Sequence, residues 1–342
     1  MGSDPDEVSV FETTAEFQQG TLDYYQEKFD RWLGDPLKIL WDDYRGRFGL
    51  IVVTFYVLMG TIGVQLFPAP HPNMAPRLVP AFQDPQWILG TDASGRGLAS
   101  LMVHATPSML KMMISGAIFG NLMGVTFGLV AGYMGGKTDK IIMTFTDTLS
   151  SIPGIPLLII LAAIIEPTNP WLVGIMINIQ GWAGGARTLR AQVLPLAELE
   201  HVEASIALGE STSNLLVKEV LPHLLPLVFI GFLGGATRVI TASVGLYFLG
   251  VLPFSTQNWG VVLNSAVRNA EVMYAGDAVH WLLVPTVTIV GLTLGLTLLS
   301  QALDQVFNPR VRARHRGREN DREADKKDTD IDTAQTELTG TR

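Results

Sequence analysis

The chain has 342 residues, of which 48% are hydrophobic and 16% are charged, and its formal net charge is −8. Soluble domains carry about a quarter charged residues, so this composition argues against an ordinary soluble protein and favours one that resides in a membrane. The chain contains no cysteine, which excludes disulfides, thiol catalysis and cysteine-ligated metal.

The acidic charge is concentrated at the two ends of the chain. Residues 1–43 hold eleven Asp and Glu against three Lys and Arg, and residues 320–342 hold seven against four. We expect residues 1–47 to be a cytoplasmic N-terminal extension and residues 309–342 a charged cytoplasmic tail, both solvated and disordered because apolar residues are few. Such an acid excess is also typical of proteins exposed to high internal salt, which suggests a halophilic source.

The tail opens with a basic stretch, residues 310–318. Because this stretch directly follows an apolar run, we expect it to lie against anionic lipid headgroups and not to bind nucleic acid.

Six stretches are apolar enough to cross a bilayer, which takes about 20 residues of helix. They are residues 48–67, 112–136, 141–165, 171–186, 224–254 and 281–303. The third contains Pro153 and Pro156, so we expect its first turns to be kinked or interfacial. The fourth is short and contains glycine. The sequence therefore predicts an all-α membrane protein with six transmembrane helices.

Six spans place both termini on one side of the membrane, and the basic residues indicate which side. With cytoplasmic termini, most Lys and Arg fall inside, whereas the outer side holds only Arg77, Arg96, Lys111 and Arg268. This orientation makes residues 48–67 the first transmembrane helix, 68–107 an extracellular loop and 108–308 the transmembrane core. It also places the hydrophilic segment 191–222 in the cytoplasm.

The segment 191–222 is patterned as two short amphipathic helices joined at a glycine. Gly209 would end the first helix in a left-handed conformation. Ser211 or Ser213 can cap the second helix, and Pro222 would mark the boundary before the fifth span. Such a pair forms a compact knob that fits a cleft on another protein. The alternative is a helix pair that lies flat on the lipid.

The same segment resembles the EAA loop of ABC-transporter permeases, in which Glu-Ala-Ala is followed by Gly and a Leu-Pro ending. The matching residues are Glu203, Ala204, Gly209, Leu221 and Pro222. Other stretches resemble the dipeptide and oligopeptide permeases in the expected order, and they are residues 89–92 with 95–96, 131–136, 246–250, 259–260 and 308–310. The chain is similar to the C-type permease subunit of a peptide importer.

This resemblance implies the type I ABC importer permease fold, with a cytoplasmic coupling helix-turn-helix. The partners it implies are a second homologous permease subunit, two ABC ATPase subunits and an extracellular solute-binding protein, all acting within or at membrane lipids. Glu203 would contact the ATPase, Ala204 would pack closely, and Gly209 would form the turn. The implied function is import of dipeptides or oligopeptides, and nickel or another small solute is an alternative for the same fold.

Four positions depart from the family pattern. Ser205 replaces the second alanine of the EAA motif, and Glu219 stands where an apolar residue is common. Gly97 replaces the usual acid after Gly-Arg, and Ser243 falls where many relatives have glutamate. Any role of those carboxylates in relatives is therefore not carried over to this chain.

Residues 131–138, AGYMGGKT, match a relaxed phosphate-loop pattern, but a phosphate loop follows a buried strand and opens a helix. Here the motif closes an apolar run long enough to span the membrane, so we interpret it as a Gly-rich cytoplasmic turn. The six histidines show no paired metal spacing. We therefore expect a permease subunit and not an enzyme, with no cofactor of its own and with ATP bound by its partners.

Arg238 stands in the middle of the fifth apolar stretch, where a cation costs about 2.5 to 3.5 kcal/mol on insertion scales. A cation in such a place usually faces a cavity or a partner. Arg238 would either line the translocation path near a peptide carboxylate or pair with a carboxylate or carbonyls of the other permease subunit. Outside the importer class, a secondary transporter or a channel without ATPase subunits also fits the pattern of spans.

Overall fold

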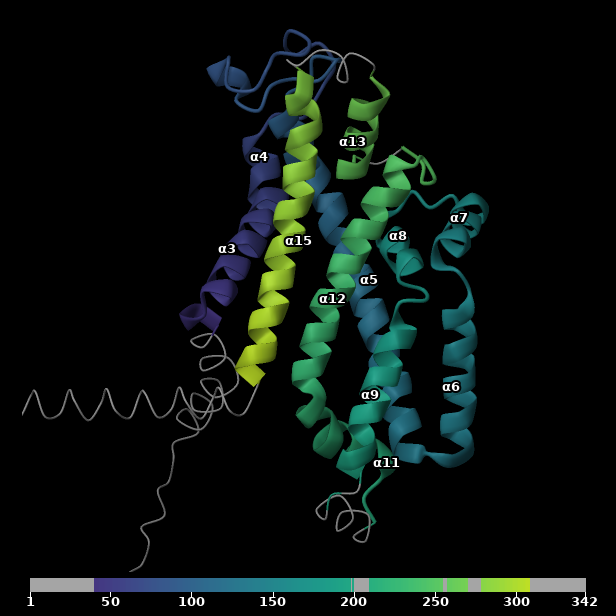
Figure 1. Cartoon of the computed structure of the whole chain (residues 1–342). Coiled ribbons are helices and arrows are strands. Elements are labelled where there is room, and N and C mark those ends of the chain that lie inside the picture. Colours follow the sequence, from purple (N-terminus) through teal and green to yellow (C-terminus); the bar gives the residue numbers. More distant parts are fainter. Residues whose placement is uncertain (1–39, 198, 200–208, 255–256, 270–277, 308–342) are drawn as a thin grey trace, which may run out of the picture.

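The computed structural model describes residues 40–197, 199, 209–254, 257–269 and 278–307 (Figure 1). Across these residues the regular elements are helices, and the strand-like contact is an isolated bridge between Thr91 and Gly97. Four helices are long and apolar enough to cross a membrane, and a bent pair of helices adds a fifth candidate span. The prediction of an all-helical membrane protein is confirmed for this part of the chain.

The first candidate span joins three helical pieces into one rod of 23 residues, Tyr44–Leu66. The pieces are α3 (Tyr44–Leu58), a π-helical turn (Met59–Gly63) and α4 (Val64–Leu66). Helix is the favoured form because it satisfies every backbone polar group within the segment. The rod contacts α15 (Val279–Phe307), the last candidate span, and the two lie side by side in purple and yellow (Figure 1).

The central helix is α5 (Leu98–Met134), which has 37 residues and contacts α8, α9, α12 and α15. It begins well before the span expected at residues 112–136. Residues 98–107, which hydropathy assigns to the external loop, form its first turns, and Pro107 is accommodated inside it. The difference arises because the expected span begins after the charge of Lys111, whereas Leu98, Leu101 and Met102 are buried in the core and stabilise the earlier turns as helix.

The third apolar stretch forms two helices with a sharp bend. α6 (Gly136–Ser151) and α7 (Gly154–Ile165) pass the test for a span together and meet at 83°. Pro153 stands immediately before α7 and has no N–H with which to continue the hydrogen bonds of α6. The predicted kink is therefore confirmed.

The fourth apolar stretch is divided between two helices. α8 (Pro170–Ile177) has 8 residues and α9 (Trp182–Ala197) has 16, and residues 178–181 form turns between them. Neither helix reaches the 17 or so residues that a single span requires. The structure therefore provides up to five candidate spans, and the sixth transmembrane helix stays a prediction.

The fifth apolar stretch lies in a continuous rod of 37 residues, Thr212–Phe248. It consists of α11 (Thr212–Leu215), a π-helical turn (Leu216–Val220) and α12 (Leu221–Phe248). The short helix α13 (Trp259–Arg268) follows and packs between α12 and α15. Its Trp259 is fully buried, and the indole N–H donates to the Met102 carbonyl of α5 at 3.2 Å.

A row of glycines on α5 makes the contact with α8 and α9. These glycines recur at every fourth position, and they are Gly116, Gly120, Gly124, Gly128 and Gly132. A Cβ at Gly116 would lie 2.4 Å from the carbonyl oxygen of Gly174, and one at Gly128 would lie 2.7 Å from the Cβ of Leu189. Small residues at this spacing let two helix backbones approach closely. We refer to these five residues as the glycine seam.

The loop before α5 is fixed by Asp92, whose side chain is fully buried. Its carboxylate accepts hydrogen bonds from the amides of Ser94 at 2.9 Å and Arg96 at 2.8 Å, and it forms an ion pair with the Arg96 side chain. At Gly97, where relatives usually carry an acid, a Cβ would lie 2.6 Å from the ring of Trp87. The packing of Trp87 therefore accounts for this departure from the family pattern.

Candidate functional site

The first group of expected functional residues lies around Gly209. Glu203 and Ala204 fall outside the residues that the structure describes. Gly209 has φ of +82°, the left-handed conformation predicted for it. A Cβ there would meet no atom within 4 Å, so the backbone angle, and not a lack of space, requires glycine.

The helix after Gly209 begins with a serine cap. The hydroxyl of Ser211 accepts a hydrogen bond from the Asn214 amide at 3.4 Å, which makes Ser211, and not Ser213, the capping residue. Further along, Val220 is 1% exposed. It belongs to a buried apolar cluster with residues from α5, α9 and α12, namely Leu129, Leu189, Val193 and Leu224. The segment that follows Gly209 is thus anchored to three helices of the core.

The boundary expected at Pro222 coincides with the start of α12 at Leu221, but it is not a break, because the chain is already helical from Thr212. The helix runs through both residues, and a π-helical turn directly precedes them. The Leu221 amide donates to the Leu216 carbonyl, five residues back. This wide turn changes the hydrogen-bond register just before a residue that has no N–H to donate, so Pro222 is accommodated without a break.

Two ion pairs connect α6 to α9, the helix that leads toward Gly209. Arg190 binds Asp139 through two nitrogens, and its Nη2 to Oδ2 distance is 2.5 Å. Arg187 binds Asp147 at 2.8 Å and donates to the Ser150 hydroxyl at 3.1 Å. The two pairs hold α6 and α9 together along one side.

Gln180, in the turn between α8 and α9, bonds to the break between α6 and α7. Its amide nitrogen donates to the carbonyl of Leu149 and, at 2.6 Å, to the carbonyl of Ile152. These carbonyls lie at the end of α6, where the regular pattern of helical hydrogen bonds stops and the Leu149 carbonyl accepts, among the described backbone amides, only that of Ile152, at 3.4 Å. The two interrupted helix pairs are therefore joined at their breaks.

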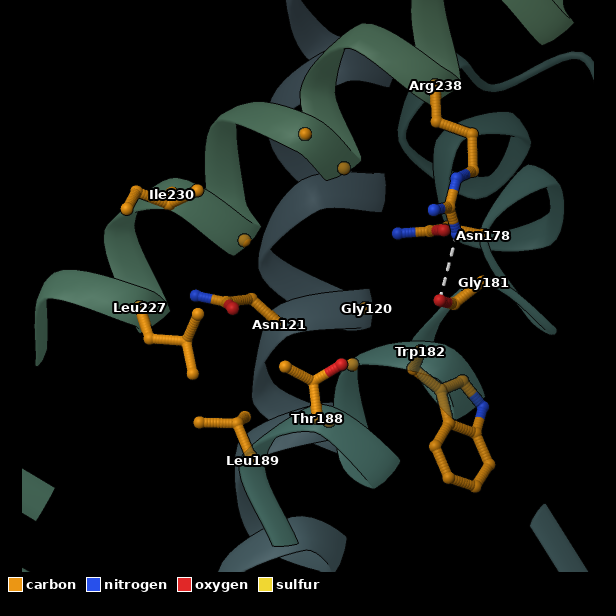
Figure 2. A pocket seen from close by; sticks show the side chains of 15 residues that line it. Gly120, Asn121, Asn178, Gly181, Trp182, Thr188, Leu189, Leu227, Ile230 and Arg238 are labelled. Atoms are coloured by element: carbon orange, nitrogen blue, oxygen red, sulfur yellow. Dashed lines mark hydrogen bonds between the residues drawn. The ribbon is translucent and has the colours of Figure 1, made fainter. Parts of the chain in front are cut away.

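The second group of functional residues surrounds Arg238 of α12. Its Nη1 donates to the carbonyl oxygen of Gly181 at 2.9 Å, as the dashed line marks (Figure 2). Arg238 lines two neighbouring cavities, one of about 210 Å³ and one of about 350 Å³. The first lies between α5, α9, α12 and the turn at residues 178–181. The carbonyl partner of Arg238 therefore comes from its own chain, which neither interpretation of the sequence considered.

Asn178 adjoins Arg238 and is only 2% exposed. Its amide nitrogen donates to the Gly116 carbonyl at 2.6 Å, whereas its Oδ1 is buried without a hydrogen-bond partner in the described part of the chain. A Cβ at Gly181 would lie 2.0 Å from this Oδ1 and 2.6 Å from Arg238 Nη1. The orphan acceptor and the guanidinium thus flank the same glycine, and Figure 2 shows the two side chains together.

The structure explains two further features that the sequence singled out, the phosphate-loop-like motif and Ser243. Residues 131–138 connect α5 to α6, helix to helix, which is not the strand-to-helix setting of a phosphate loop. Ser243, where many relatives carry glutamate, is fully buried, and its hydroxyl donates to the Ile240 carbonyl at 2.9 Å.

Sequence reasoning missed the glycine seam and the residues that hold Arg238. The four-residue spacing of glycines over residues 116–132 was a readable signal for close helix packing. Asn178 and Gly181 gave no local signal, because their importance depends on a helix that is about 57 residues further along the chain. The pairing of Asp139 with Arg190 was likewise not predicted.

Comparison with known proteins supports the resemblance. Residues 124–313 match the family described as the binding-protein-dependent transport system inner membrane component. The oligopeptide transport system permease protein OppC of Haemophilus influenzae is 30% identical over 296 residues, which are 82% of this chain and 92% of that protein. The oligopeptide transport system permease protein OppC of Bacillus subtilis is 29% identical over 252 residues, 68% of this chain and 81% of that protein.

The dipeptide transport system permease protein DppC of Bacillus subtilis is 30% identical over 225 residues, 64% of this chain and 68% of that protein. The family match begins within the glycine seam, at residue 124, and takes in Gly209, Arg238 and α15. Together with the apolar helices, it identifies a membrane protein that crosses the bilayer several times. The chain belongs to the family of binding-protein-dependent transport system inner membrane components.

Proposed function

We propose that this chain is one of two permease subunits of an importer that moves dipeptides or oligopeptides across the cell membrane. Two ABC ATPase subunits bind and hydrolyse the ATP, and an extracellular solute-binding protein delivers the peptide. The names of the relatives support this proposal, because they are permease proteins of oligopeptide and dipeptide transport systems. This chain binds no cofactor itself.

The proposed topology has six crossings and cytoplasmic termini. α8 and α9 together make the fourth crossing, although neither is long enough alone. The distribution of Lys and Arg supports this orientation, and it puts the segment around Gly209 on the ATPase side. Glu203 and Ala204 are then the contact residues of a coupling knob, with Gly209 as its turn.

The observation that carries the proposal is the mechanical connection of this knob. α9 leads toward it, and the helix after Gly209 continues without a break into α12. Both α9 and α12 line the cavity beside Arg238. A displacement of the knob by the ATPase would therefore move two walls of the cavity directly. Leu221 and Pro222 transmit this motion as part of the continuous helix.

The test is ATP-dependent uptake of trialanine by the four-component complex in proteoliposomes, with ATP hydrolysis measured alongside. Charge reversal at a protein interface commonly costs 2 kcal/mol or more, so Glu203→Lys is expected to lower uptake more than about tenfold. ATP hydrolysis and the amount of the chain in the membrane should persist.

Gly209 provides a matched pair of variants. Gly209→Asn keeps access to the left-handed conformation and should transport well, whereas the β-branched side chain in Gly209→Val opposes that conformation and should uncouple transport. Normal uptake in both Glu203→Lys and Gly209→Val would reject the coupling knob. Uptake of nickel in place of trialanine would keep the importer and replace its substrate.

A further inference from the structure

The charge of Arg238 is not neutralised by any described residue. Within the described part of the chain its side chain makes one hydrogen bond, to the carbonyl of Gly181, although a guanidinium carries five N–H donors. The described ion pairs involve other residues, and none includes Arg238. A cation within an apolar span and without an anion is costly, so an anion is expected to meet it at some stage of function.

The surroundings hold the guanidinium in place and leave room beside it. The Gly181 carbonyl fixes one nitrogen, and the orphan Oδ1 of Asn178 lies beside the same glycine, close to the point where its Cβ would be. Neither group carries a formal charge, so the positive charge stays available. Arg238 borders both cavities, and its side chain is exposed to them.

The wall of the smaller cavity is unusual in its side chains. Seven of its fifteen lining residues are glycine, and besides Gly181 they are Gly120, Gly124, Gly185, Gly231, Gly234 and Gly235. The glycines leave backbone groups on this wall, and Trp182, Leu227 and Ile230 supply its larger apolar side chains. Such a wall can accommodate transported solutes with different side chains, provided that all of them carry a group that binds the guanidinium.

We propose that Arg238 is a carboxylate-binding station in the translocation path, positioned by Gly181 and Asn178. The ligand class is a solute with a free carboxylate, such as the C-terminus of a peptide. A guanidinium suits this group because it can bind both carboxylate oxygens at once. The inference rests on the proposed import function and adds to it a recognition step within the permease.

The test compares trialanine, which has a free carboxylate, with its C-terminal amide in proteoliposomes that contain the complete complex. Both peptides are supplied above the concentration that saturates the binding protein, as established by calorimetric titration, so differences in uptake arise after delivery. The wild-type complex should transport the free acid about tenfold faster than the amide, or more. Arg238→Gln should bring this ratio close to one.

Two further variants sharpen the comparison. Asn178→Asp places a fixed carboxylate beside Arg238 and should also abolish the preference for the free acid, with Arg238 still present. Lys111→Gln is the control, because it removes one positive charge from α5 at a residue that borders neither cavity, and it should keep the wild-type ratio.

A wild-type ratio near one, or an unchanged ratio in Arg238→Gln, would overturn the inference. Loss of co-purification with the second permease in Arg238→Gln would also overturn it, since the anion would then be a carboxylate of that subunit. If the wild-type complex takes up neither peptide, the proposed import function fails instead, which is a separate outcome.

Discussion

At the scale of single residues, close backbone approach decides which side chains the membrane core accepts. Gly174 of α8 lies against α5, where a Cβ would be 2.2 Å from the Met112 carbonyl oxygen and 2.2 Å from the Ser115 hydroxyl. A backbone carbonyl cannot turn away as a flexible side chain can. The residue type at Gly174 is therefore dictated by its neighbour across the interface.

We expect Gly174→Ala to destabilise the protein by about 1–3 kcal/mol, the usual cost of overpacking a tight site. Gly245→Ala in α12 is the control, because a Cβ there meets no atom within 4 Å. Thermal unfolding in detergent, followed by size-exclusion chromatography of heated samples, measures both. Equal midpoints for Gly174→Ala and Gly245→Ala would contradict the close packing of α5 and α8.

At the scale of elements, the two interrupted helix pairs are tied to each other by polar contacts. Gln180 covers the broken end of α6, and two arginines of α9 bind two aspartates of α6. The two ion pairs differ in exposure. The side chains of Arg190 and Asp139 are 32% and 18% exposed, whereas those of Arg187 and Asp147 are 46% and 61% exposed.

This difference predicts unequal coupling energies for the two ion pairs. Exposed pairs are worth about 0.2–1 kcal/mol, so we expect the Arg187 pair to lie below about 0.5 kcal/mol and the better shielded, two-pronged Arg190 pair to reach about 1 kcal/mol. Double-mutant cycles with alanine, read from thermal unfolding at low and high salt, measure both values. A larger coupling energy for the Arg187 pair would show that the burial of these ion pairs does not determine the order of their coupling energies.

At the scale of the whole molecule, the number of crossings decides where the termini lie. Five candidate spans would put the termini on opposite sides, whereas a sixth crossing made by α8 and α9 puts them on the same side. The two helices pack along one face of α5 through the glycine seam, which supports a joint crossing. The break between them places Asn178 and Gly181 beside Arg238.

The topology can be measured by labelling single introduced cysteines, because the wild-type chain has no cysteine and gives no background labelling. We expect a membrane-impermeant maleimide to label Gln83→Cys in intact cells, and to label Ser3→Cys and Thr341→Cys only after permeabilisation. Labelling of one terminal cysteine but not the other in intact cells would establish an odd number of crossings.

Features encoded within a few neighbouring residues followed from the sequence alone. Apolar length predicted candidate spans, Pro153 predicted the bend, and Gly209 predicted a left-handed turn. A serine cap was predicted at Ser211 or Ser213, and the structure has it at Ser211. These succeed because backbone angles, missing N–H groups and hydrophobicity act locally. Pro222 shows the limit of such reasoning, since a π-helical turn accommodates a residue that locally indicates a boundary.

The tertiary structure alone decided which distant residues meet. Asp139 and Arg190 are 51 positions apart, and Gly181 and Arg238 are 57 apart. Such partners depend on how α5, α9 and α12 pack. The glycine spacing on α5 indicates close packing, but no local pattern says which residues it brings together. The sequence determined a helical membrane protein with a cation in an apolar span. Only the fold decided that this cation would stand beside a glycine-rich cavity with no anion among the described residues, because that required three helices and a turn to meet there.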